Sequence, residues 1–197
     1  MFNFDFESSP SAKREHVRLD NIFDIIKRIE CSWTNGPWIA GGCARALYEN
    51  KLDEINDIDV WCANSNQLTS LQKCFTEGHA FYTMHESDNA ITLTNDVGYK
   101  LQLIKKKWYH SPEEIFADYD FTCCQIATTD GKEFHFSPYA QQDIVDRRLL
   151  VSKFNRESFL ARYAKYRAYG FDMPYAELEQ YLKQKPNREF NGQDLDY

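Results

Sequence analysis

The spacing of apolar positions changes along the chain, and each spacing predicts a different kind of element. Isoleucines at three- and four-residue intervals predict a helix within residues 12–31. A short apolar run at 38–40 then predicts a strand that ends at a pair of glycines, and residues 43–50 (CARALYEN) predict the helix that follows. Strict alternation of apolar and polar positions in 55–63 (INDIDVWCA) predicts a second strand.

The middle of the chain continues to alternate between helical and strand patterns. Residues 65–75 predict a helix that is capped by Ser65 or Asn66. Three segments then predict successive strands, at 79–86, 89–95 and 98–104. This mixture predicts a sheet flanked by helices.

Cap and turn residues divide the second half of the chain. The segment SPEE at 111–114 predicts a helix start, with its serine as N-cap and its last glutamate completing a capping box. Residues 121–136 predict a hairpin that turns at Asp130-Gly131. From residue 141 the pattern becomes helical, and 155–171 predicts the strongest helix of this half, with a glycine as its C-terminal cap.

These elements predict two structured parts and a tail. Residues 1–148 are expected to form an α+β domain, a mixed sheet flanked by helices, and residues 149–185 a small helical appendage. The polar residues 186–197 are expected to be loosely held. With 197 residues, of which 43% are hydrophobic, the chain is long enough to bury a core.

Composition excludes several classes of protein. No apolar run has the length that spans a bilayer, and the N-terminus lacks an export signal, so a cytoplasmic protein without a membrane partner is expected. The six cysteines form no Cys-x-x-Cys pair, which predicts reduced, mostly buried thiols instead of a zinc or disulfide framework. A net charge of −7 disfavours a protein that binds nucleic acid through non-specific phosphate contacts, and the lysines at 105–107 fit solvated surface charge.

The most informative chemistry lies in the first two predicted strands. Asp57 and Asp59 are two positions apart, so their carboxylates share one face of a strand, about 6 to 7 Å apart. Such carboxylates repel one another unless a cation neutralises them, and Mg²⁺ (or Mn²⁺) prefers carboxylate oxygens together with substrate phosphates. Gly41-Gly42 lets the backbone approach a phosphate, with Arg45 one helical turn away. The combination predicts a triphosphate cradle facing a two-carboxylate metal site.

The same residues resemble a known family. The stretch from GGCAR to NDIDVW is similar to the signature of the DNA polymerase β-type nucleotidyltransferases, most closely class II tRNA CCA-adding enzymes and bacterial poly(A) polymerases. Three later segments resemble further motifs of that family in the same order, at 119–127, 142–151 and 156–171. The resemblance implies a polymerase β-like nucleotidyltransferase head followed by a helical neck. It also implies a minimal form without the body and tail domains that grip tRNA.

The resemblance implies roles for individual residues. These are metal binding by Asp57 and Asp59, triphosphate binding at Gly41 and Gly42, which Arg45 would assist as a cation, and nucleotide contacts by Asp120 and Arg162. Base stacking or contact with the acceptor is a further interpretation of Tyr166, Arg167 and Arg148. Tyr163, Tyr166 and Tyr169 share one side of the predicted neck helix, and core packing and base stacking both stay open for them.

Several positions differ from the family pattern. Ala46 stands where an aspartate is usual, and Tyr119 where an arginine precedes the matched aspartate. The base-reading pattern is altered at Ser158 and Arg162, which leaves the preferred base open. Gln102 stands where many relatives carry a third carboxylate.

The residues and the resemblance together predict a nucleotidyltransferase that moves a nucleoside monophosphate from a nucleoside triphosphate, such as ATP, to a hydroxyl acceptor. An RNA or tRNA 3′ end is the acceptor that the family implies. A protein or small-molecule acceptor, as in a toxin-like enzyme, is one alternative. Another is a non-catalytic nucleotide-binding module that regulates a partner protein, which the altered motif residues favour and the two aspartates disfavour.

Overall fold

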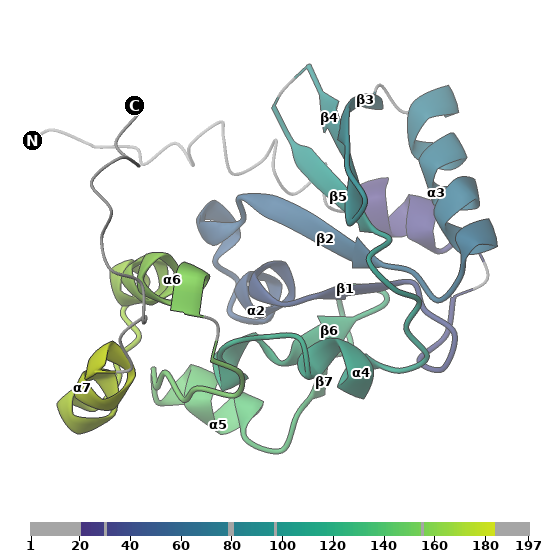
Figure 1. Cartoon of the computed structure of the whole chain (residues 1–197). Coiled ribbons are helices and arrows are strands. Elements are labelled where there is room, and N and C mark those ends of the chain that lie inside the picture. The colour runs from purple at the N-terminus through teal and green to yellow at the C-terminus, as the bar shows by residue number, and fades with distance from the viewer. Residues whose placement is uncertain (1–20, 30, 79–80, 97, 155, 184–197) are drawn as a thin grey trace, which may run out of the picture.

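The computed structural model describes residues 21–29, 31–78, 81–96, 98–154 and 156–183 (Figure 1). Its centre is a seven-stranded sheet with the order β3-β4-β5-β2-β1-β6-β7. The strands are β1 (Trp38–Ala40), β2 (Asp57–Trp61), β3 (Phe81–Glu86), β4 (Ala90–Asn95), β5 (Lys100–Ile104), β6 (Ile126–Thr128) and β7 (His135–Phe136). Strands β2 and β5 pair in parallel, and the other neighbouring pairs are antiparallel, so the sheet is mixed as predicted.

Helices flank this sheet and follow it. They are α2 (Gly42–Tyr48), α3 (Ser65–Gly78), α4 (Pro112–Phe116), α5 (Ala140–Val145), α6 (Arg156–Ala168) and α7 (Tyr175–Lys183), with short 3₁₀ helices η1 (Leu52–Glu54) and η2 (Thr122–Cys124). Residues 21–26 are also helical, and the rest of the helix predicted within 12–31 lies largely outside the described residues. The α+β class is confirmed.

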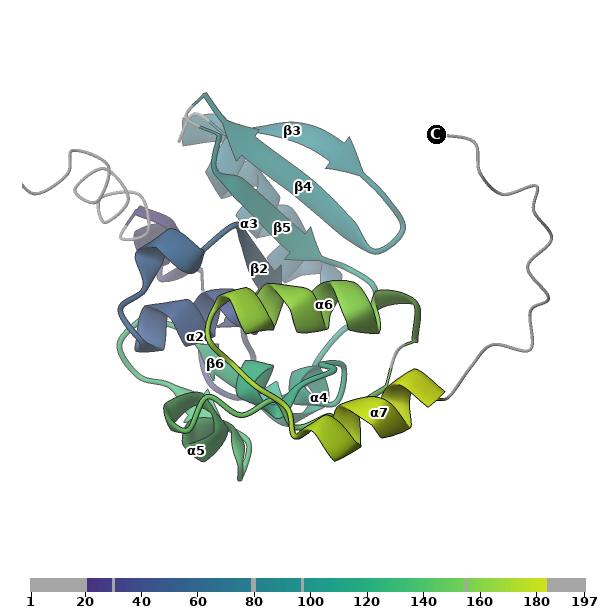
Figure 2. The same ribbon diagram turned by 90° about the vertical axis from the view of Figure 1, so that its left-hand side faces the viewer.

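The two faces of the sheet are covered by different helices. Figure 2 shows α3 behind β3, β4 and β5, and α6 on the opposite side. Side chains alternate accordingly, because Leu101 and Leu103 of β5 are buried in the same core cluster as Leu71 of α3. The side chains of Lys100 and Gln102 therefore lie on the other face, toward the side that α6 occupies.

A second core cluster joins the C-terminal helices to the sheet domain. Phe159 and Tyr166 of α6 pack in one cluster with Phe121. Backbone bonds also cross the predicted boundary at residue 148, because the amide of Asp172 donates to the carbonyl of Arg147 at 2.7 Å. The division into a head and a neck at this residue stays a prediction, and the predicted tail at 186–197 lies outside the described residues.

Local caps differ from two predictions. The N-terminus of α3 is capped by Asn64, whose Oδ1 accepts from the Gln67 amide at 2.9 Å, so the prediction of Ser65 or Asn66 was wrong by one or two positions. Ser111 does precede α4, but its side chain makes no cap hydrogen bond, and Glu114 accepts instead from the His110 amide. The capping box is therefore not formed.

Other local predictions are confirmed. Gly170 follows α6 with φ +84°, the left-handed conformation of a C-terminal cap. The hairpin between β6 and β7 turns through Asp130, whose Oδ1 accepts from the amides of Lys132 and Glu133. All six cysteines are free, and four of them are buried. Among the described residues, no helix has the length and apolar character needed to cross a membrane.

Candidate active site

A cavity of about 200 Å³ lies beside β2, with α6 among its walls. Strand β2 contributes Asp57 and Asp59 to its lining, and α6 contributes Arg162 and Lys165. Asp120 and Tyr169 also line it. The structure therefore brings together residues that are up to 127 positions apart in the chain, Gly42 and Tyr169.

The two aspartates of β2 lie on the face of the strand that the period-two pattern predicted. Ile58 and Val60, the residues between and after them, are fully buried on the other face. Burial first, and then the charge of Asp57, raise the pKa of the Asp59 carboxyl to about 6, while Lys165 and Arg162 act in the opposite direction. Lys165 and Arg162 therefore neutralise the negative charge of the two carboxylates only in part.

This charge fits a divalent cation. Within the described part of the chain, no group of three or more His, Cys, Asp and Glu side chains could hold a metal ion. The residue beside Asp59 on β5 is Gln102, and the residue beside Asp57 is Lys100. A cation bound here would have the carboxylates of Asp57 and Asp59 as ligands and would need water or substrate oxygens for the remaining positions.

The glycine turn is fixed at the start of α2. Gly41 has φ +78°, and a Cβ atom at this position would lie 2.4 Å from the hydroxyl oxygen of Tyr119. Its amide donates to the carbonyl of Ile126 in β6 at 3.0 Å, and its carbonyl accepts from the amide of Arg45 at 2.9 Å. Of the two glycines, Gly42 lines the cavity. A residue with a side chain does not fit at Gly41.

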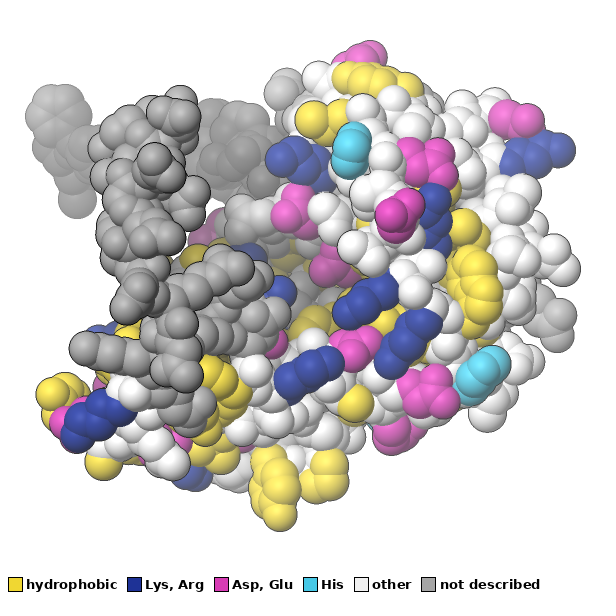
Figure 3. Space-filling model, in the orientation of Figure 1, with side chains coloured by type: hydrophobic (Ala, Val, Ile, Leu, Met, Phe, Trp, Pro, Cys, Tyr) yellow, Lys and Arg dark blue, Asp and Glu magenta, His cyan; other side chains and the backbone are white. Residues whose placement is uncertain are grey.

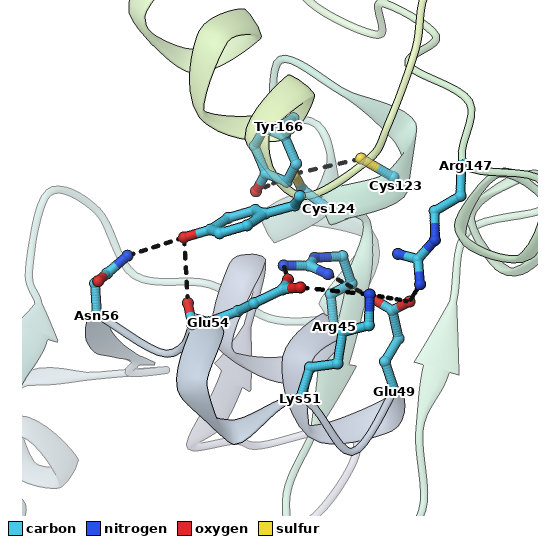
Figure 4. Close-up of polar contacts among 10 residues, drawn as sticks. Arg45, Glu49, Lys51, Glu54, Asn56, Cys123, Cys124, Arg147 and Tyr166 are labelled. Atoms are coloured by element: carbon cyan, nitrogen blue, oxygen red, sulfur yellow. Dashed lines mark hydrogen bonds and ion pairs between the residues drawn. The ribbon is translucent and has the colours of Figure 1, made fainter.

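Arg45 has other partners than the sequence analysis expected. Its side chain is only 1% exposed, and its guanidinium forms ion pairs with Glu49 and, at 2.5 Å, with Glu54 (Figure 4). The same guanidinium lies 5.2 Å from the ring centre of Tyr169. A cationic group with these protein partners is already neutralised, although the residue borders the cavity.

Helix α6 presents a charged face to the cavity. The Nη1 of Arg162 lies 2.9 Å from Oδ2 of Asp120, and the hydroxyl of Ser158 donates to the same oxygen at 3.4 Å. Asp120 is 4% exposed, whereas the Arg162 side chain is 47% exposed. Lys165 follows Arg162 by three positions and so lies on the same side of the helix. This face brings positive charge toward the two carboxylates of β2.

The three tyrosines of the neck helix have different surroundings. Tyr166 is buried, its hydroxyl accepts from the Cys124 thiol at 2.8 Å, and its ring packs against Phe121. Tyr163 stacks on Phe159 within the same core cluster and does not line the cavity. Tyr169 borders the cavity with its hydroxyl bonded to the Nδ2 of Asn56 at 3.1 Å. Tyr166 and Tyr163 therefore serve core packing more than base stacking.

Two of the predicted residues lie apart from the cavity lining. Arg167 forms an ion pair with Asp172 at 2.7 Å and donates to the carbonyl of Phe171. The backbone of Arg148 forms an isolated parallel β-bridge with that of Asp172. Contact of these two arginines with an acceptor stays a prediction.

Figure 3 shows basic and acidic side chains intermixed on the face between β5 and α4. There Lys107 and Lys153 both contact Asp118, at 3.2 and 3.1 Å. Lys105 likewise pairs with Glu86 at 2.6 Å. These ion pairs agree with the interpretation of the lysines at 105–107 as surface charge.

Sequence reasoning missed two parts of the cavity wall. Lys165 has a signal in the sequence, because it falls three positions after Arg162 on a predicted helix. Asn56 and Glu54 have none, because their partner Tyr169 lies more than a hundred residues away.

The sequence of the chain matches a family of known proteins. The model of a family described as Gabija anti-defense 2 family protein matches residues 13–147. The chain is 32% identical over 100 residues to "Gabija anti-defense 2" of Bacillus phage SPbetaL7, an alignment that covers 50% of this chain and 24% of the phage protein. The chain thus spans about a quarter of the length of that relative.

Solved structures show the same fold at low identity. The chain is similar to the Bacillus stearothermophilus CCA-adding enzyme in complex with CTP, with a TM-score of 0.59 and 15% identity over 87% of this chain and 43% of the enzyme. It is also similar to the Thermotoga maritima CCA-adding enzyme complexed with tRNA, with a TM-score of 0.54 and 17% identity over 91% of this chain and 43% of the enzyme. The predicted likeness to the head and neck of these enzymes is confirmed at the level of the fold, over less than half of each enzyme.

Proposed function

The chain belongs to the Gabija anti-defense 2 family, and we propose that it counters Gabija defense as a metal-dependent nucleotidyltransferase. The observation that carries this proposal is the carboxylate pair of Asp57 and Asp59, which lines a cavity together with Arg162 and Lys165. Opposite charges arranged in this way suit a nucleoside triphosphate that is bound with a divalent cation.

Each part of the cavity wall has a task in this reaction. Asp57 and Asp59 would hold Mg²⁺ or Mn²⁺, which supplies charge neutralisation and activation of a hydroxyl nucleophile when it is bound. Arg162 and Lys165 offset negative charge on the phosphates, and the backbone at Gly42 allows a close approach. Asp120, whose carboxylate Arg162 orients at 2.9 Å, contacts the ribose. The acceptor hydroxyl then displaces pyrophosphate from the α-phosphate.

The strands next to β2 offer the acceptor a positive charge beside the two aspartates. From Asp57 the register leads to Lys100 on β5 and Thr94 on β4, so these residues follow one another on the same face. Lys100 is exposed and carries the charge that an RNA strand would meet next to the carboxylates. We therefore propose an RNA or tRNA 3′ end as the acceptor, with a hydroxyl of a host protein or small molecule as the competing class.

A second function has its own support. Gln102 stands beside Asp59 where a third carboxylate would complete the metal site, and the Arg45 guanidinium is already bound by two glutamates. Both features favour a protein that binds a nucleotide without transferring it and acts on a component of the defense system by association.

One experiment separates the two functions. The protein is incubated with α-³²P-labelled nucleoside triphosphates, Mg²⁺ or Mn²⁺, total tRNA and a lysate of cells that carry Gabija. The same preparations of Asp57→Asn/Asp59→Asn protein and of Asp53→Asn, an exposed aspartate outside the cavity, serve as variant and matched control. In parallel, each variant is tested for rescue of a Gabija-sensitive phage.

The outcomes differ clearly. Label on RNA or on a protein band that needs both aspartates, together with rescue that needs them, supports transfer and identifies the acceptor. Full rescue by the double variant without any labelling contradicts the nucleotidyltransferase and supports the binding function.

A further inference from the structure

A network of charged side chains lies at the wall of the cavity, between α2 and the C-terminal end of α6 (Figure 4). Arg45 contacts Glu49 and Glu54, Lys51 lies 3.4 Å from Glu54, and Arg147 lies 2.5 Å from Glu49. The side chains of Glu49 and Glu54 are 8% and 12% exposed. Because charges buried to this extent need their partners, the network fixes α2 against η1.

Aromatic rings of the neck lie directly on this network. The guanidinium carbon of Arg45 is 5.2 Å from the ring centre of Tyr169 and 5.3 Å from that of Phe171. The guanidinium carbon of Arg147 is 4.9 Å from the same Phe171 ring. These distances are those of cation–π contacts, so the end of α6 is attached to the charges of the head.

Tyr169 also reaches the rim of the cavity. Its hydroxyl accepts from the Nδ2 of Asn56 at 3.1 Å and donates to the backbone carbonyl of Glu54 at 3.4 Å. Asn56 immediately precedes Asp57, and both line the cavity with Tyr169. One tyrosine thus links the Arg45 network to the segment that leads into the carboxylate strand.

We propose that Arg45 is a positioning residue that acts through Tyr169 and Glu54. It holds the segment 54–56 in place, so that Asp57 and the rim of the cavity keep their positions for a nucleotide. This inference rests on the proposed function, because the nucleotide is taken to bind in the cavity. This role takes the place of the direct contact between Arg45 and a triphosphate that the sequence predicted. Such a contact would require the guanidinium to leave Glu49 and Glu54, whose carboxylates already neutralise it.

The test is a double-mutant cycle on ligand affinity. Arg45→Lys keeps the charge but loses the two-pronged geometry, Tyr169→Phe removes only a hydroxyl, and the third variant combines both. Dissociation constants are measured for ATP and for adenosine, each with Mg²⁺, and for CTP and cytidine in the same way. We expect each single variant to weaken triphosphate and nucleoside binding by a similar factor, about tenfold. The double variant should bind about as well as Arg45→Lys alone.

Two results would overturn the proposal. Loss of triphosphate affinity in Arg45→Lys with unchanged nucleoside affinity would show that the guanidinium contacts the phosphates. Factors that multiply in the double variant would show that Arg45 and Tyr169 act independently. Tyr163→Phe is the matched control, because Tyr163 belongs to α6 but does not line the cavity, and its affinities should equal those of the unchanged protein.

A second measurement needs no ligand. Amide hydrogen exchange of residues 51–57 should become faster in Tyr169→Phe and stay unchanged in Tyr163→Phe. If the unchanged protein binds neither nucleotide, the proposed function fails, and the exchange rates still decide whether Tyr169 holds this segment. Equal exchange in all three proteins would contradict the positioning role.

Discussion

At the scale of single residues, the ionised carboxylate of Asp59 lowers the stability of the folded protein, because it is buried and lies near the charge of Asp57. Its pKa of about 6 lies above the usual value of a carboxyl, so the folded protein binds this proton more tightly than the unfolded chain does. The free energy of unfolding therefore falls as the pH rises from about 4 to about 6, and the full cost is present above that range.

We expect Asp59→Asn to be more stable than the unchanged protein at pH 7.5, because asparagine has no charge to desolvate. The difference should be at most about 3 kcal/mol and should become small near pH 3, below both pKa values, where Asp59 is mostly protonated in the folded and the unfolded state. Urea denaturation at the two pH values, without divalent cations, measures it. A variant that is less stable at both pH values would show that the carboxylate is not a source of strain.

A substitution at Gly41 tests the close approach of the backbone at the start of α2 to the side chain of Tyr119. Gly41→Ala should lower the free energy of unfolding by about 2 to 3 kcal/mol, because a Cβ adds a clash with the Tyr119 hydroxyl to an unfavourable φ. Gly98→Ala is the control, since Gly98 has φ +85° but no atom within 4 Å of the added carbon, and about 1 kcal/mol is expected there. Equal losses at both glycines would remove the Tyr119 contact as the cause.

At the scale of elements, the parallel pairing of β2 and β5 decides what stands beside the carboxylates. Asp59 is aligned with Gln102, so one substitution on the neighbouring strand can add a third carboxylate to the pair. Three carboxylates repel each other unless a cation neutralises them, so the effect of this substitution on stability depends on whether a cation is bound.

We expect Gln102→Asp to lower the melting temperature in the presence of a chelator and to make it rise with added Mg²⁺ or Mn²⁺. The loss without cation should be about 1 kcal/mol, and stabilisation by the cation should follow its concentration. Thermal melts with and without cation measure both effects. Gln142→Asp, an exposed position on α5, should show neither, and a cation response equal to that of this control would contradict a metal site at β2.

At the scale of the whole molecule, the C-terminal helices complete the core of the sheet domain. Phe121 packs against Phe159 and Tyr166 of α6, and the amide of Asp172 is bonded to the carbonyl of Arg147. A head without this neck would expose the apolar surface that these rings cover.

Truncation after residue 148 should therefore give a protein that loses cooperative unfolding or binds a hydrophobic dye. Truncation after Lys183, the last described residue, keeps every contact described here and should melt as the full chain does. Calorimetry and dye binding compare the two. A cooperative melt of 1–148 near that of the full chain would establish the head as an independent domain.

The sequence by itself determined the elements and the shared face of the two aspartates. A period of two in 55–63 places Asp57 and Asp59 together whatever surrounds the strand, and helix caps such as Gly170 follow from local backbone preference. The α+β class follows from the order of these local patterns, which is why it was predicted correctly.

Only the tertiary structure decided the partners of these residues. Arg45 was read from its neighbours as a phosphate ligand, but Glu54, Tyr169 and the other rings that surround it come from separate segments. The raised pKa of Asp59 and the bond between Asn56 and Tyr169 likewise depend on which segments meet. Local patterns fix the direction of a side chain, whereas burial and electrostatics depend on distances between groups that the chain brings together only when it folds.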